Sequence, residues 1–297
     1  MNSFDTHMAH YSIKEVETLT GVKAHTLRIW EQRYHLLKPR RTKTNIRYYT
    51  DEQLRLLLNI GTLNRSGMKI SKIAGLTSEQ MGKEVLVLHN TPNSDNLLDS
   101  MIHCMLDFDE RRFEKILSNA IMKIGFEATV TRLIFPFLNR TGVLWATGSV
   151  KVVQEHYITN LIRRKILVAT DAQPVEPNAQ SKKFVLFLPE QESHELLLLF
   201  TEYLLRKNNH EVAYIGARLP VGELAYIYQV YKPDYLVTFL TAPLEDTTPA
   251  AYCKKLSTMF PQCKIVTGGV QMEQVKGGLP SNCVLVRSQE DLLGIIS

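Results

Sequence analysis

A large flat ring and an adjacent acid–imidazole pair stand ten positions apart near the middle of the chain. They are Trp145, Glu155 and His156, in the run GVLWATGSVKVVQEHYITNLIRRKI. Helical segments rarely need a carboxylate and an imidazole side by side, and a tryptophan ring can lie across a flat ligand instead of only filling a core. A core tryptophan next to a solvated Glu-His pair is the alternative interpretation of the same residues.

A second acid–imidazole pair follows a short apolar run further along the chain. Glu192 and His194 lie in PEQESHELL, directly after FVLFL at 184–188, where we expect a strand-to-helix turn. Ligands of doubly wound sheets bind beyond the carboxyl ends of the strands, so this position suits a binding site. Four further residues lie at the ends of later apolar runs: Thr238, Leu240, Gly268 and Gly269.

Length and composition limit the possible classes of protein. A chain of 297 residues is long enough for two or three domains with substantial cores. The N-terminus has no signal-peptide pattern, the longest apolar run (196–200) is too short to span a bilayer, and no nucleophile–base pair argues for catalysis. We therefore expect a cytoplasmic, non-enzymatic protein. Its cysteines lack metal-finger spacing and are expected to be reduced thiols: Cys104, Cys253, Cys263 and Cys283.

Positive charge is concentrated at the N-terminus. Residues 1–80 hold 13 Lys and Arg against seven Asp and Glu, a balance of +6, whereas the whole chain has a net charge of +5. The other 217 residues therefore sum to −1. A basic N-terminal module on a near-neutral body is typical of a nucleic-acid binder, although a solvated basic face would give the same balance.

The basic region contains the pattern of a helix-turn-helix. We expect helices at 13–19 and 22–30, with Ser12 as the N-cap of the first and Gly21 in the turn between them. The second helix of such a unit enters the major groove of DNA.

A basic segment with two tyrosines follows the two helices. KPRRTKTNIRYY, residues 38–49, is expected to form a two-stranded wing, and Thr50 with Gln53 is a capping box for the next helix. Lysine and arginine side chains in the wing are suited to phosphate oxygens, and aromatic rings can pack along the sugar backbone. We expect helices at 51–64 and near 70–76 after the wing.

The string TLRIWEQRY…KPRR…IRYYTDEQL resembles the winged helix-turn-helix of MerR-type regulators over residues 11 to about 78. The RIWEQRY variant resembles the subgroup fused to corrinoid-binding modules. The resemblance implies binding of double-stranded DNA as a dimer or larger homo-oligomer, with Trp30 as a packing anchor for the wing. The residues it assigns to DNA contact are Thr26 and Arg28 on the recognition helix, and Arg33, Arg41, Lys43, Arg47 and Tyr48 around the wing.

The middle of the chain predicts a linker and then a helical bundle. Residues 81–94 are interpreted as the linker, and apolar periodicity over 95–170 predicts four helices. Pro136 is expected to kink or break the third helix. Trp145 is expected in a glycine-flanked loop, residues 142–148, before the fourth helix.

The C-terminal part changes to the pattern of a parallel sheet. After a second predicted linker at 171–183, short apolar strands alternate with helical stretches through 184–297. This pattern predicts an α/β, flavodoxin-like (Rossmann-like) domain with a five-stranded parallel sheet. The expected strands are residues 184–188, 211–215, 235–240, 264–267 and 284–286.

The residues at the strand ends resemble a cobalamin-binding domain. Glu192-Ser-His194 is similar to the family's Asp-x-His, Thr238-Phe-Leu240 is close to its Ser-x-Leu, and a Gly-Gly pair follows after 27 residues. The resemblance implies that His194 is the lower axial ligand to the cobalt of cobalamin. A carboxylate at Glu192 would fix the tautomer of that imidazole. The Gly268-Gly269 pair would let the nucleotide tail of the cofactor approach the backbone.

The spacing of Trp145, Glu155 and His156 resembles the Trp-x9-Glu-His signature of the cap in CarH-type (CarH/LitR-like) cobalamin-dependent photoreceptor repressors. The resemblance implies that these residues line the pocket of the adenosyl group of adenosylcobalamin. It also implies a transcriptional repressor controlled by cobalamin and responsive to light.

Two positions depart from the family pattern. Leu197 replaces the glycine that leaves room for the nucleotide tail, and Ala146 replaces a histidine that can ligate cobalt after illumination. A second interpretation therefore stays open: a cobalamin-independent MerR-type regulator whose corrinoid-type fold serves oligomerisation or protein contacts. A corrinoid methyl-carrier module would share the cap and the sheet but would not explain the N-terminal domain.

Overall fold

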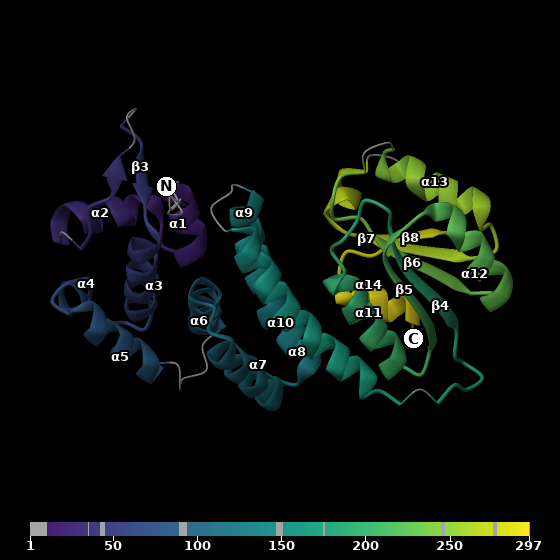
Figure 1. Ribbon diagram of the computed structural model, residues 1–297, viewed down its shortest axis with the longest axis horizontal. Helices are drawn as coiled ribbons and strands as arrows, with labels where there is room; N and C mark the ends of the chain where they lie inside the picture. The colour runs from purple at the N-terminus through teal and green to yellow at the C-terminus, as the bar shows by residue number, and fades with distance from the viewer. Residues whose placement is uncertain are drawn as a thin grey trace, which may run out of the picture. The chain divides into compact units, whose positions relative to one another are not determined.

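The computed structural model divides into two compact units, Met1–Leu161 and Ile162–Ser297, with the boundary inside helix α10 (Val152–Asp171) (Figure 1). No helix among the described residues has the length and apolarity needed to cross a membrane. The structure describes residues 11–34, 36–41, 45–88, 94–146, 151–174, 176–244, 247–275 and 278–296.

The N-terminal helix-turn-helix and wing are present as predicted, with one more strand. A capping box between Ser12 and Glu15 begins the first helix, and Gly21, at φ 70°, ends it. Residues 11–12 pair antiparallel with the last wing strand, so the sheet has three strands in the order β1-β3-β2 instead of two. The elements are β1 (Tyr11–Ser12), α1 (Ile13–Thr20), α2 (Ala24–Tyr34), β2 (Arg40–Arg41) and β3 (Arg47–Tyr49).

The segment expected to be a linker is mostly helical. Helix α3 (Asp51–Arg65) and helix α4 (Ile70–Ile73) follow the wing, and helix α5 (Ser78–Leu88) then packs on α3. Residues 81–88 of the predicted linker 81–94 are therefore helical, residues 89–93 lie outside the described part, and residue 94 begins the next helix. The physical reason is a further capping box, in which Thr77 and Gln80 exchange hydrogen bonds of 2.8 and 3.2 Å. Met81 and Val85, one turn apart, are both buried.

The helical region contains the expected helices, but two details differ. Pro136 does not break the third helix: the π-helical turn Val130–Ile134 precedes it, and Phe135 N–H bonds to the carbonyl of Val130, five residues earlier. A wider turn relieves the clash between a proline ring and the preceding turn. Trp145 lies in a helix and not in the loop we expected, because the helix continues past residue 142 to residue 146. The elements before α10 are α6 (Ser94–Asp107), α7 (Glu110–Ile124), α8 (Phe126–Thr129), the π-helical turn and α9 (Phe135–Ala146).

The C-terminal unit is the predicted flavodoxin-like sheet. Its five strands are all parallel, in the order β5-β4-β6-β7-β8, and β4 is buried on both faces from Phe184 to Leu188. Helices α12 and α13 pack on one face, and Figure 1 shows α11 and α14 on the other. The strands are β4 (Lys183–Pro189), β5 (Glu211–Leu219), β6 (Tyr235–Phe239), β7 (Lys264–Gly268) and β8 (Cys283–Leu285). The helices are α11 (Leu196–Lys207), α12 (Leu224–Tyr231), α13 (Pro249–Met259) and α14 (Gln289–Ile296).

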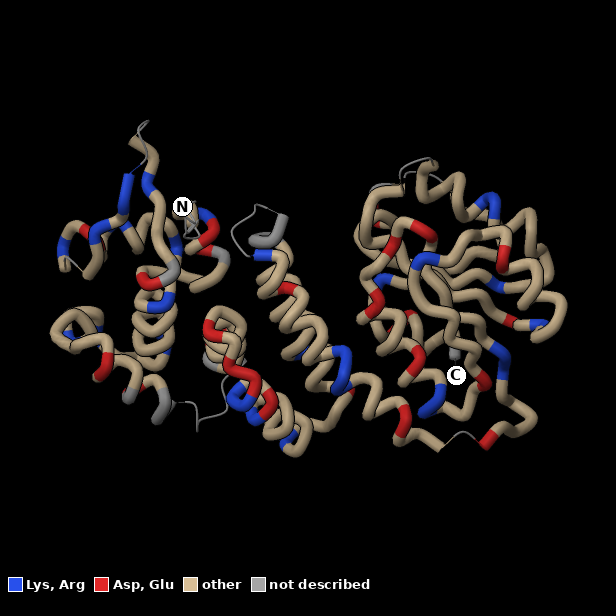
Figure 2. Tube along the Cα trace, in the orientation of Figure 1, with Lys and Arg blue, Asp and Glu red and all other residues tan. Residues whose placement is uncertain are grey.

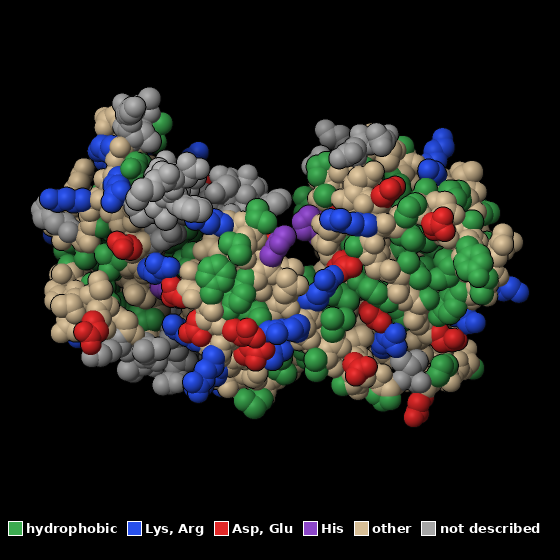
Figure 3. Space-filling view, viewed as in Figure 1, with side chains coloured by type: hydrophobic (Ala, Val, Ile, Leu, Met, Phe, Trp, Pro, Cys, Tyr) green, Lys and Arg blue, Asp and Glu red, His purple; other side chains and the backbone are tan. Residues whose placement is uncertain are grey.

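The edge strand β5 is irregular and borders apolar surface. Its pairing with β4 shifts register twice, and Gly216 and Arg218 have φ values of 89° and 60°. Exposed apolar side chains gather over α12 next to it (Figure 3), including Tyr226 and Val230, which are 73 % and 68 % exposed. An interrupted ladder disfavours the addition of another strand at this edge.

Candidate functional site

The recognition helix α2 has one buried and one exposed face. Leu27 and Trp30 are buried, whereas Arg28 is exposed and Thr26 is partly exposed. Trp30 is buried, and its role as a packing anchor for the wing stays a prediction. The helix therefore presents Thr26 and Arg28 outward while its other face is held in the domain.

Glu31 joins the recognition helix to the wing, a role that sequence reasoning missed. Its carboxylate accepts a hydrogen bond from the Tyr49 hydroxyl, and Arg47 Nε lies 3.5 Å from its other oxygen. Burial, and then the contact with Glu31, raises the pKa of Tyr49, which keeps its hydroxyl as the donor. Helix and wing are thus held as one surface.

The wing carries exposed cations, and Figure 2 shows Lys and Arg along its strands. Arg41 is exposed and closes the wing tip by donating to the Oδ1 atom of Asn45 at 2.8 Å. Tyr48 lies on the central strand, opposite Ser12 and Arg40. Exposed Arg33 lies over the ring of Tyr34 at 5.6 Å. The predicted contact Lys43 lies outside the described residues.

The residues expected to line the pocket of the adenosyl group are only partly brought together. Glu155 stands in the first turn of α10 and His156 follows it, with Oε2 of the acid 3.5 Å from Nε2 of the imidazole. The other oxygen of Glu155 accepts from the Thr159 hydroxyl at 2.9 Å. His156 is 69 % exposed. The side chain of Trp145 is outside the described part, so the role of this group as a pocket stays a prediction.

At the carboxyl end of the sheet, Glu192 is buried and both of its carboxylate oxygens accept hydrogen bonds. It is 1 % exposed, and its Oε1 atom lies 2.6 Å from Nδ1 of His194. Its Oε2 atom accepts the backbone N–H groups of Thr241 and Ala242 at 2.6 and 2.7 Å, from the loop after β6. One carboxylate thus ties the loop after β4 to the loop after β6.

The same contacts set the charge of Glu192 and the tautomer of His194. Burial raises the pKa of Glu192, but hydrogen bonds from His194 and from backbone amides outweigh it and bring the pKa from 4.5 to about 2. An ionised carboxylate can only accept, so Nδ1 of His194 carries the proton that it receives. In the neutral imidazole the lone pair is then on Nε2, and His194 is half-exposed. This arrangement suits a metal ligand.

The paired glycines have a structural explanation within the chain. A Cβ at Gly268 would stand 2.6 Å from the carbonyl oxygen of Val286, and one at Gly269 would stand 2.5 Å from that of Leu240. The protein's own backbone therefore requires both glycines, whether or not a ligand tail approaches them. Thr238 is different, because its Oγ1 atom is buried without a hydrogen-bond partner among the described residues.

Two family models match this chain. The model of the MerR HTH family regulatory protein matches residues 11–80, and that of the B12 binding domain matches residues 97–169. The chain joins a MerR-type domain to a B12-binding domain. The match to the B12-binding domain covers the helical region, so the roles of the sheet residues remain predictions.

Two curated proteins are similar to this chain over most of their length. The HTH-type transcriptional repressor CarH of Myxococcus xanthus is 28% identical over 245 residues, which are 80% of this chain and 81% of the relative. The HTH-type transcriptional repressor CarA of the same organism is 23% identical over 286 residues, 95% of each chain. The chain is homologous to both. The monomethylamine corrinoid protein of Methanosarcina barkeri shares the fold, with a TM-score of 0.54 at 10% identity over 68% of this chain and 98% of that one.

The residues of the sheet fit a corrinoid in part. The Glu192–His194 pair is a suitable donor set for the lower axial position of cobalt, and the orphaned hydroxyl of Thr238 is one polar atom that a ligand could satisfy. Leu197, in the first turn of α11, is a branched side chain where the family has glycine. The Glu192–His194 pair therefore fits a corrinoid. Whether Leu197 leaves room for the nucleotide tail is the point to test.

Proposed function

We propose that this protein is a cytoplasmic, non-enzymatic, DNA-binding transcriptional repressor that is controlled by adenosylcobalamin. The observation that carries the proposal is the Glu192–His194 pair at the carboxyl end of a parallel sheet, in a chain whose N-terminus is a MerR-type domain. The homology to two transcriptional repressors over most of their length supports it.

The DNA-binding role rests on the basic helix and wing. Arg28 and Thr26 would read base edges in the major groove, and Arg41 with other wing residues would contact phosphates. One such domain recognises few base pairs, so the protein would act as a dimer or tetramer on a repeated or palindromic operator.

The cofactor role rests on the chain's own side chains. His194 would ligate cobalt through Nε2, and Glu192 would hold the ring in that orientation. Thr238 would give its hydroxyl to the nucleotide tail, whereas Trp145 and Glu155 would line the opposite, adenosyl side. Adenosylcobalamin supplies a light-sensitive cobalt–carbon bond. The presence or absence of the adenosyl group would then be the signal.

Visible absorption tests the cofactor role directly. We expect wild-type protein mixed with adenosylcobalamin in the dark to retain the red cofactor through gel filtration and to show the spectrum of a nitrogen ligand on cobalt. His194→Ala should lose that spectrum. Ser193→Ala is the matched control, because only the backbone N–H of Ser193 is engaged with Glu192. A His194→Ala protein with the wild-type spectrum would exclude this ligand.

The cobalamin-independent regulator remains the second candidate, and two observations favour it. Leu197 stands in the place of the family's glycine, and the Gly268-Gly269 pair is explained by the chain's own backbone. If the wild-type protein retains no cobalamin and its oligomeric state is the same with and without it, this candidate replaces the first.

A further inference from the structure

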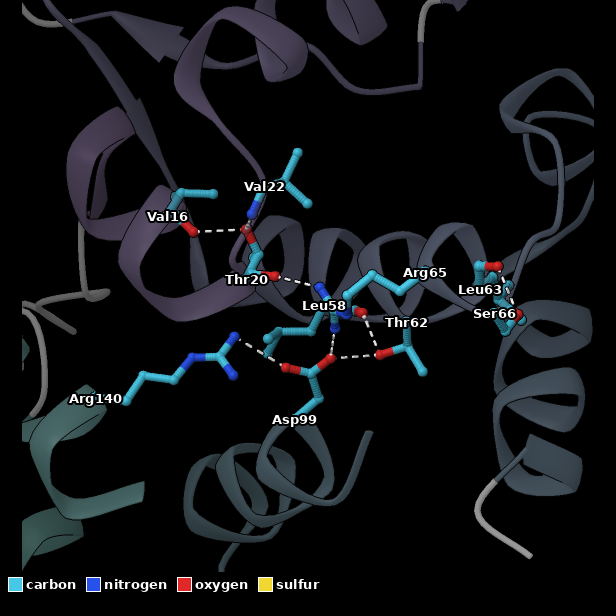
Figure 4. Close-up of polar contacts among 10 residues, drawn as sticks. All are labelled: Val16, Thr20, Val22, Leu58, Thr62, Leu63, Arg65, Ser66, Asp99 and Arg140. Carbon is cyan, nitrogen blue, oxygen red and sulfur yellow. Dashed lines mark hydrogen bonds and ion pairs between the residues drawn. The ribbon is translucent and has the colours of Figure 1, made fainter. Parts of the chain in front are cut away.

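A carboxylate lies buried where α3, α6 and α9 approach one another in the N-terminal unit. Asp99 of α6 is 1 % exposed and accepts the hydroxyl of Thr62 at 2.6 Å. It also forms ion pairs with Arg65 of α3 and with Arg140 of α9, the latter at 2.9 Å (Figure 4). Burial raises the pKa of Asp99, and both arginines oppose the rise. A buried charge of this kind persists only with its partners in place.

Arg65 extends this cluster to the helix-turn-helix. Its Nη1 atom donates to the carbonyl oxygen of Thr20, the last residue of α1, at 2.6 Å. The hydroxyl of Thr20 in turn donates to the carbonyl of Val16 at 2.7 Å and accepts the N–H of Val22 at 3.2 Å. Figure 4 shows these contacts side by side. One guanidinium therefore holds the turn that sets the start of the recognition helix.

Arg140 connects the cluster to helix α9. It stands on α9, which also carries Trp145 five residues later. Helix α9 belongs to the segment matched by the B12-binding domain, whereas Thr20 and Arg65 belong to the segment matched by the MerR-type domain. A continuous set of ion pairs and hydrogen bonds thus crosses from one domain to the other through Asp99.

We propose that Asp99 is a positioning residue that transmits the state of the helical region to the recognition helix. A displacement of α9 moves Arg140, which changes the pairing of Asp99 and shifts the guanidinium of Arg65 at the turn. Charges in a low-dielectric interior have few acceptable arrangements, so a small shift at one partner is felt by the others. The proposal rests on the proposed function, in which Trp145 of α9 would line the adenosyl side of the cofactor.

We call the transmission from Arg140 through Asp99 to Arg65 the relay. One pair of variants distinguishes the relay from a contact that only stabilises the fold. Arg140→Gln cuts the cluster at α9 and leaves the contacts of Asp99 with Thr62 and Arg65. Arg55→Gln is the matched control: Arg55 pairs with Asp107 at 2.9 Å and also joins α3 to α6, and its polar contacts within the described residues are with Asp107 and Leu106, outside the turn and α9. Both variants remove one arginine from the same unit.

The first measurement needs no ligand. Hydrogen exchange of the backbone amides of residues 20–24 reports the turn before α2 in the full-length protein. We expect exchange there to be about tenfold faster in Arg140→Gln and unchanged in Arg55→Gln. The reason is that the loss of Arg140 changes the pairing of Asp99 and shifts Arg65, whose guanidinium holds the carbonyl of Thr20. Wild-type exchange at the turn in Arg140→Gln would overturn the relay.

The second measurement uses the ratio of DNA dissociation constants with and without adenosylcobalamin in the dark. The probe is a duplex selected by the wild-type protein from a random pool. We expect the ratio to fall by about fivefold or more toward 1 in Arg140→Gln and to stay at its wild-type value in Arg55→Gln. Asp99→Asn should act in the same direction as Arg140→Gln.

The outcomes distinguish the two proposals. A less stable Arg140→Gln protein with the wild-type ratio would make the cluster a structural contact only, and the relay would be wrong. If the wild-type protein itself shows no effect of adenosylcobalamin on DNA, the proposed function fails instead. The hydrogen exchange at the turn then still decides whether α9 and the turn are linked.

Discussion

The Oε1 atom of Glu192 accepts two hydrogen bonds from His194, one from the ring Nδ1 at 2.6 Å and one from the backbone N–H at 2.9 Å. The acid therefore fixes both the position of the residue and the orientation of its ring. The second oxygen accepts hydrogen bonds from the loop after β6. The position of the imidazole therefore depends on the loops that follow two strands, β4 and β6.

The first prediction concerns these two hydrogen bonds between Glu192 and His194. Glu192→Gln removes the ionised acceptor and leaves an NH₂ group facing N–H donors, either those of His194 or those of Thr241 and Ala242. We expect affinity for adenosylcobalamin to fall by about 10–100-fold, as is typical when the support of a metal-ligating histidine is lost. Titration followed by visible absorption measures this. Glu190→Gln, an exposed neighbour, is the control. Equal affinities in the two variants would mean that the carboxylate does not support ligation.

A second prediction addresses the space at the start of α11. Leu197→Gly should tighten binding of adenosylcobalamin if the leucine side chain occupies the space of the nucleotide tail. Glycine also weakens a helix by about 1 kcal/mol, so Leu196→Gly is needed as a control with the same backbone cost. Equilibrium dialysis of both variants gives the comparison. Affinity that rises in neither variant would show that Leu197 points elsewhere.

Phosphate contacts by the wing give a third prediction. Arg41→Ala should weaken binding to all DNA sequences alike and reduce the slope of log K against log salt by about 1, because a phosphate contact carries no base information. Arg47→Ala should cost more, since it also leaves Glu31 without its cation. Fluorescence anisotropy on two unrelated duplexes over a salt series measures both effects. Lys115→Ala, exposed on α7, should match wild type, and an unchanged slope for Arg41→Ala would count against its role.

The fourth prediction concerns stability at alkaline pH. Burial raises the pKa of the Cys104 thiol from 9.0 to about 12. The folded state then holds the proton more tightly than the unfolded state, so this contribution is complete below pH 9 and is lost as the pH rises toward 12. At pH 10 the loss is about 1.4 kcal/mol. Urea denaturation at pH 8 and pH 10 should show that Cys104→Ala loses less stability than wild type. Identical losses would mean that this thiol does not contribute.

Local sequence signals determined most of the fold. The apolar runs predicted all five strands of the sheet, because parallel strands are buried on both faces and need no alternation. The capping residues Ser12, Gly21 and Thr50 located helix ends correctly. The helix over 81–88 was missed, although Thr77 and Gln80 form the same kind of capping box. Position 142 misled us, because a glycine that is tolerated inside a helix looks like a loop residue.

The site was less predictable, because its partners are distant in sequence. The motif identified Glu192, but nothing local indicates that it accepts backbone amides 49 and 50 residues later. Asp99 gave no signal at all, since its arginines stand 34 and 41 positions away on other helices. The Gly268-Gly269 pair suggested room for a ligand, whereas the nearest atoms to both positions are the chain's own.

The buried cluster at Asp99 also limits how this chain can be recombined. The family matches to residues 11–80 and 97–169 place a boundary for a domain exchange near residue 80. A chimaera that imports a new DNA-binding domain without counterparts of Thr62 and Arg65 would leave Asp99 facing one arginine in an apolar interior. A domain exchange at that boundary therefore has to supply partners for Asp99 at positions 62 and 65.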